Sequence, residues 1–206
     1  MAGSMSREDL AADLKASLHD AASVLNAPGG VDFERLLDAA AADMGRVRPL
    51  RLLGEITVQA EEPLYDAPAD MAGRPILLWG KGEKLEPWSR TYLRQPELMV
   101  IGSGGQALQL LFRPAPTLAQ IAKWGSAAEF TYPARHSIGT TAADTTIQPA
   151  DRGLLLLRAQ AEAMRELAMR NVTKPVQLRD GFSQAPRNGT PSALYQTLLE
   201  EFERRA

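Results

Sequence analysis

The spacing of apolar residues changes twice along this 206-residue chain. Near both ends, apolar residues recur every three or four positions, which is typical of helices that pack by one face. Between about residues 50 and 148 they alternate with polar residues in short runs interrupted by prolines, which is typical of antiparallel strands. The sequence therefore predicts an α+β fold, in which an antiparallel β domain is inserted into a helical bundle.

The expected organisation has three parts. Residues 5–48 and 150–172 form the helical domain, residues 50–148 form the β-rich insertion, and residues 173–206 form a linker and a last helix. The first part predicts a helical hairpin, with N-caps at Ser6 and Asp32. Its apolar stripes comprise Leu10, Leu14 and Leu18 in the first helix and Phe33, Leu36, Leu37, Ala40 and Met44 in the second.

The middle segment predicts a small antiparallel sheet or sandwich. Residues 55–60 alternate apolar and polar side chains, and residues 75–79 and 128–134 are further strand candidates. Two apolar runs within residues 97–112 flank a glycine-rich turn, which indicates a hairpin.

A long helix is expected over about residues 151–171. Its apolar arc is wide, and the charged residues of the remaining face should be solvated: Arg158, Glu162, Arg165, Glu166 and Arg170. Glu162 with Arg165, and Glu166 with Arg170, have the spacing of stabilising helical ion pairs.

The last helix is predicted to start with Thr190 as N-cap and Pro191 at its first position. Leu194, Leu198 and Phe202 follow at intervals of four residues. Because the preceding linker is polar, we expect that this helix can pack away from its own domain.

Composition excludes several classes of protein. The chain has no cysteine, so disulfides, thiolate metal sites and cysteine nucleophiles are ruled out. A formal net charge of −2 gives no global attraction to nucleic acid or anionic membranes. No apolar run approaches the roughly 20 residues that span a bilayer, so no membrane association is expected.

Catalytic motifs are sparse. His136 lies beside Ser137, but neighbouring side chains on an extended chain point apart, and no nucleophile elbow is present. The acids Glu61, Glu62, Asp66 and Asp70 are close in sequence but lack a recognisable partner group. No metal-ligand spacing or cofactor motif occurs, so neither a metal nor a cofactor is expected.

Several sequence segments together resemble those of a known family. They are FERLLDAAAADMGRVRP, EITVQAEEPLYDAPADM, FRPAPT, AEFTYPARH and DRGLLLLRAQAEAMRELA, in this order. In element order they are similar to head-to-tail connector proteins of tailed bacteriophages, also called adaptor or neck proteins. The resemblance implies that the helical domain, residues 5–48 and 150–172, forms a ring, usually twelve-fold. This ring would dock beneath the portal, offer a surface to the next neck or tail protein, and catalyse no reaction. The β-rich middle is larger than in purely helical adaptors, so the partner that it faces stays open.

This resemblance assigns roles to two helices. The C-terminal helix would bind the portal through Leu194, Tyr195, Leu198 and Phe202, and the long helix would contact a neighbouring subunit through Leu157, Ala161, Met164 and Ala168. The expected location is the virion neck, assembled in the host cytoplasm, with non-specific proximity of the lumen to packaged DNA. Two alternatives remain at this point: a small hydrolase or transferase using His136, and a non-viral intracellular protein-binding module.

Overall fold

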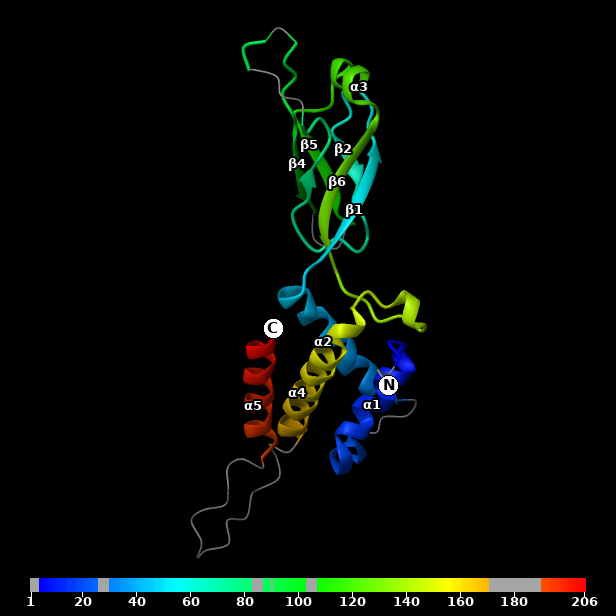
Figure 1. The fold of residues 1–206 in the computed structure, drawn as a ribbon, viewed down its shortest axis with the longest axis vertical. Coiled ribbons are helices and arrows are strands. Elements are labelled where there is room, and N and C mark those ends of the chain that lie inside the picture. Colours follow the sequence, from blue (N-terminus) through cyan, green and yellow to red (C-terminus); the bar gives the residue numbers. More distant parts are fainter. Residues whose placement is uncertain (1–3, 26–29, 83–86, 90, 103–106, 171–189) are drawn as a thin grey trace, which may run out of the picture. The chain divides into compact units, whose positions relative to one another are not determined.

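The computed structural model describes residues 4–25, 30–82, 87–89, 91–102, 107–170 and 190–206. The fold is α+β, as predicted: the described residues contain helices and two antiparallel three-stranded sheets (Figure 1). The chain divides into two compact units. One unit, the helical unit, comprises residues 1–48 and 136–206, and the other, the β unit, comprises residues 49–135.

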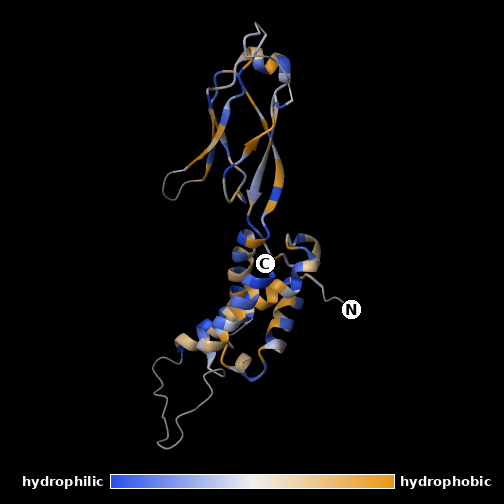
Figure 2. Cartoon of the chain, turned by 60° about the vertical axis from the view of Figure 1, so that its left-hand side comes forward, coloured by the Kyte–Doolittle hydropathy of each residue, from blue (hydrophilic) through white to orange (hydrophobic). Residues whose placement is uncertain are grey.

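The helical unit is built around α4 (Arg152–Arg170), which packs against α2 (Val31–Val47) and α5 (Pro191–Arg205) and also touches α1 (Arg7–Ser17). Short 3-10 turns complete it: η1 (His19–Ser23), η3 (Ala142–Asp144) and η4 (Pro149–Asp151). Apolar residues recur along each of the helices (Figure 2), and every predicted stripe residue of α1 and α2 is buried in one common core.

The helix starts follow local capping chemistry. Ser6 caps α1 and Thr190 caps α5, each by accepting a hydrogen bond from the backbone three residues later; both predictions are confirmed. The prediction of Asp32 as the N-cap of α2 is wrong. Gly30 occupies the cap with a left-handed φ of 76°, and Asp32 lies in the first turn, where its carboxylate faces arginines instead.

The second boundary of the β unit differs from the prediction. Residues 136–148 belong with the helices, because Ile138 and Ile147 are buried in the helical core. The backbone N–H of Arg7 donates to Gly139 O at 3.0 Å, which fastens this segment to the start of α1.

The β unit is a pair of facing sheets. One has the order β1-β6-β3 and the other β2-β5-β4, with strands β1 (Leu50–Thr57), β2 (Leu64–Asp66), β3 (Ile76–Leu77), β4 (Glu97–Ile101), β5 (Gln109–Arg113) and β6 (Ala127–Ala134). The predicted hairpin within residues 97–112 is confirmed, since β4 and β5 pair antiparallel. Inward-facing residues of both sheets, including Phe112 and Phe130, form a separate core together with Trp79, which follows β3.

A short helix in the β unit, α3 (Leu118–Trp124), was not predicted. Thr117 and Gln120 form a capping box at its start, and Thr-x-x-Gln is a sequence signature of such a box. The signal was therefore available, but the helix is too short to show a periodic apolar stripe.

Candidate functional site

The predicted portal-binding stripe of α5 faces its own chain. Phe202 is fully buried, and Tyr195 and Leu198 are half-buried against the helical core. Only Leu194 is exposed, at 38%. The stripe thus covers the wide apolar arc of α4, and the expectation that α5 packs away from its own domain is wrong.

The predicted subunit interface on α4 is also largely covered. Ala161 and Met164 are buried within the chain, whereas Leu157 and Ala168 are half-buried. Leu157 packs against the helical core. The wide apolar face of α4 packs against α1, α2 and α5, so Ala161 and Met164 belong to the core of their own chain.

A buried ion cluster joins three helices. Arg158 and Glu162 of α4 are both buried and bond to each other, which corrects the prediction that they lie on a solvated face. The Nε of Arg158 donates to the Asp43 carboxylate of α2 at 2.6 Å. The guanidinium also lies 5.9 Å from the ring centroid of Phe202 in α5, within the range of a cation–π contact.

The carboxylates of Glu162 and Asp43 stabilise the positive charge of Arg158. Burial alone would lower its pKa, but Glu162 and Asp43 outweigh that effect and leave the pKa raised. Its Nη1 is buried without a hydrogen-bond partner among the described residues. The cluster therefore fixes how α2, α4 and α5 meet, at a cost in desolvation.

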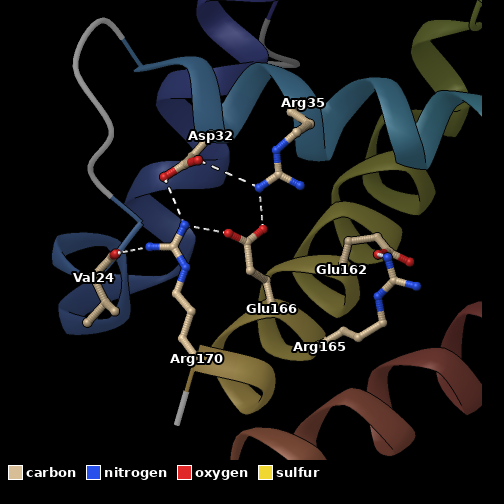
Figure 3. Close-up of polar contacts among 7 residues, drawn as sticks. All are labelled: Val24, Asp32, Arg35, Glu162, Arg165, Glu166 and Arg170. Atoms are coloured by element: carbon tan, nitrogen blue, oxygen red, sulfur yellow. Dashed lines mark hydrogen bonds and ion pairs between the residues drawn. The ribbon is translucent and has the colours of Figure 1, made fainter. Parts of the chain in front are cut away.

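A second ion cluster, the charge quartet, lies where α2 begins and α4 ends (Figure 3). Arg35 approaches Asp32 at 3.6 Å, Arg170 approaches Asp32 at 3.3 Å, and Glu166 bonds to both arginines. The hydrogen bonds to Glu166 are the largest cause of the raised pKa of Arg35 and Arg170. Four alternating charges thus close a ring between the two helices.

The quartet also reaches η1. Arg170 donates to the backbone carbonyl of Val24 at 2.6 Å, which satisfies an acceptor just after this turn. The predicted pairs Glu162–Arg165 and Glu166–Arg170 both form. The contacts from α4 to Asp32 and Arg35 were not predicted, because helical spacing reveals only partners on the same helix.

We expect Glu166→Gln to lower the free energy of unfolding of the helical unit by about 1 kcal/mol, since it weakens two partly exposed ion pairs. Urea unfolding followed by circular dichroism measures this, and added salt should reduce the difference. Glu203→Gln is the matched control, because among the described residues Glu203 forms one ion pair, with the exposed Arg46 at 3.7 Å; its effect should stay below about 0.3 kcal/mol. Equal losses in the two variants would contradict the quartet's role.

Three exposed apolar residues adjoin the quartet, two as neighbours in the sequence and one through a hydrogen bond to its backbone. Val31 precedes Asp32, Met169 precedes Arg170, and Val24 accepts the bond from Arg170; their exposed fractions are 58%, 70% and 49%. We call these three residues and the quartet the quartet end of the helical unit. Exposed apolar side chains beside a polar network are typical of a protein-binding surface.

His136 makes two structural contacts. Its Nε2 lies 2.7 Å from the backbone oxygen of Arg48, and its Nδ1 lies 3.1 Å from Thr146 Oγ1. A general base needs a ring nitrogen free for substrate, and here both are engaged. The arrangement ties residues 136–146 to the end of α2.

The acids singled out in the sequence do not form a shared site. Asp70 accepts a hydrogen bond from the phenol of Tyr132 at 3.1 Å, while Glu61, Glu62 and Asp66 are exposed. Burial is the largest cause of the raised pKa of Tyr132, with Asp70 adding to it. Within the described residues, no group of three or more His, Asp or Glu side chains could hold a metal ion.

No protein-family model matches the chain, and a search of curated proteins finds no match. In the part of the chain that the structure describes, no helix combines the length and the apolar character needed to cross a membrane.

Proposed function

We propose that this protein is a structural component of the neck of a tailed bacteriophage. It would act as a head-to-tail adaptor that forms a ring, with twelve copies as the expected number, beneath the portal. The same ring would provide the attachment surface for the next neck or tail protein, and its subunits would assemble in the host cytoplasm.

One observation carries the proposal: the quartet end presents Val24, Val31 and Met169 to solvent beside a network of ion pairs. About 25 cal/mol per Å2 is gained when such apolar surface is covered, so the surface is suited to a protein partner. The resemblance of the sequence to head-to-tail connector proteins is the second support for the proposal. The engaged ring nitrogens of His136 make the hydrolase or transferase alternative less suitable.

We also propose a different portal contact from the one predicted from the sequence. Because Tyr195, Leu198 and Phe202 pack within the chain, we assign portal binding to the quartet end and to the exposed Leu194 on the first turns of α5. Deleting α5 would uncover the core of the helical unit and is therefore an ambiguous test. Point substitutions of exposed residues avoid this problem.

We expect the double variant Val31→Glu/Met169→Glu to stay folded and to lose capture by the phage's own portal protein by at least about 100-fold, because charges would enter an apolar contact. Native mass measurement of portal mixtures tests this, and the wild-type protein should appear as a portal-bound ring. Leu53→Glu in the β unit is the control, since Leu53 is an equally exposed apolar residue at 62%. Undiminished capture by the double variant would refute the assignment.

A further inference from the structure

The sheet β2-β5-β4 has two free edges of opposite chemistry. In the described residues, β2 and β4 each pair only with β5, so the outer backbone groups of both strands are open to another strand. Both run antiparallel to β5 and are therefore parallel to each other. Copies arranged side by side around a ring would bring β2 of one copy to β4 of the next.

The β2 edge is acidic. Glu61, Glu62 and Asp66 are exposed at and beside this three-residue strand, and Leu64 between them is 40% exposed. The strand thus presents one apolar side chain between carboxylates.

The β4 edge borders a basic groove. Two adjoining cavities of about 520 and 460 Å3 lie along it and share Arg74 and Glu97 in their linings. Arg74 bonds to Glu97 at 2.6 Å, and Arg135 lines the second cavity together with Met71 and Met99. The groove is lined by both apolar residues and arginines, which complements the β2 edge.

Apolar residues also line up across the outer face of this sheet. Leu64 of β2 and Met99 of β4 are both in register with Leu111 of β5, and their neighbours Leu110 and Leu98 are buried on the inner face. A β2 strand placed against β4 in the same register would bring Leu64 beside Met99 of the next copy. The apolar row would then continue from subunit to subunit.

We propose that the β2 edge of one copy pairs in parallel with the β4 edge of the next, and that this contact closes the ring. Glu62, two residues before β2, would lie beside Glu97 and approach its partner Arg74, and Asp66 at the end of β2 would approach Arg135. The contact is heterologous, with a different edge on each side, as a closed ring requires. The inference rests on the proposed ring function and names the subunit contact.

Cysteine cross-linking of the full chain tests this contact, because the natural sequence has no cysteine. Within one copy, positions 64 and 99 are two strand spacings apart, roughly 9–10 Å, which is too far for a disulfide. Under mild oxidation, with and without portal protein, Leu64→Cys/Met99→Cys should give a ladder of covalent multimers. Each single variant should stop at dimers, and a double variant that also stops at dimers would overturn the proposal.

Charge reversal tests the complementarity. In the double-cysteine background, Arg74→Glu/Arg135→Glu or Glu62→Lys/Asp66→Lys should each reduce the ladder at least about tenfold, since like charges would meet. Mixing the two reversed proteins should restore it. Glu55→Lys, on the outer face of the other sheet, is the control and should leave the ladder intact.

The two hypotheses fail in different ways. A ladder that is insensitive to charge reversal overturns the edge pairing. Portal capture without any ladder overturns the pairing but leaves the adaptor function standing, whereas a ladder without portal capture supports the contact and refutes the function.

Discussion

Phe202→Ala is expected to lower the free energy of unfolding of the helical unit by about 3–5 kcal/mol, the range for a fully buried phenylalanine. Phe202 has no solvent exposure and is the residue that anchors α5 in the helical core. Its loss also removes the ring over which Arg158 lies. We therefore expect α5 to detach from α4 at a lower urea concentration than in the wild-type protein.

The distribution of tryptophans makes this measurement selective. All three tryptophans, Trp79, Trp88 and Trp124, belong to the β unit. Circular dichroism at 222 nm follows mainly the helices, whereas tryptophan fluorescence follows the β unit. Phe202→Ala should lower the urea midpoint of the circular dichroism transition and leave that of the fluorescence transition unchanged. Leu194→Ala is the control, since it lies at an exposed position of the same helix and should lower the free energy of unfolding by less than about 1 kcal/mol.

Arg158→Met should destabilise the helical unit by about 3 kcal/mol or more, because it leaves the buried carboxylate of Glu162 without its closest buried partner. The double variant Arg158→Met/Glu162→Leu should recover most of this loss. It removes both buried charges together, along with the unpartnered Nη1, and fills the space with apolar side chains.

A double-mutant cycle in urea measures this coupling. Additive losses in the two single variants, with no recovery in the double variant, would show that the pair adds nothing beyond packing. Arg165→Met is the control on the same helix, since Arg165 bonds to Glu162 from an exposed position at 61% and should cost about 1 kcal/mol at most.

Local sequence signals predicted much of the fold. Ser6 and Thr190 cap helices because a hydroxyl before an apolar stripe satisfies free N–H groups, a purely local effect. The hairpin of β4 and β5 was likewise predicted from two apolar runs around a glycine-rich turn. These features depend on neighbours in the sequence and need no knowledge of distant contacts.

The partners of α4 could not be predicted in the same way. Arg158 and Glu162 look like a solvated face on a helical wheel, yet Asp43 and Phe202 from two other helices cover them. Ile138 and Ile147 are two isolated apolar residues without a period, so their place in the helical core was not visible. The apolar stripe of α5 was predicted correctly, but periodicity does not determine whether such a stripe packs within its own chain or against another chain.

The first and last strands of the β unit have a consequence for the evolution of this protein. Leu50 pairs with Ala134, so the chain enters and leaves this unit at neighbouring points. Chain ends held this close make a segment easy to insert, exchange or delete, since the surrounding scaffold need not change its path. Related proteins could therefore keep the helices and diversify by replacing the whole β unit, residues 49–135.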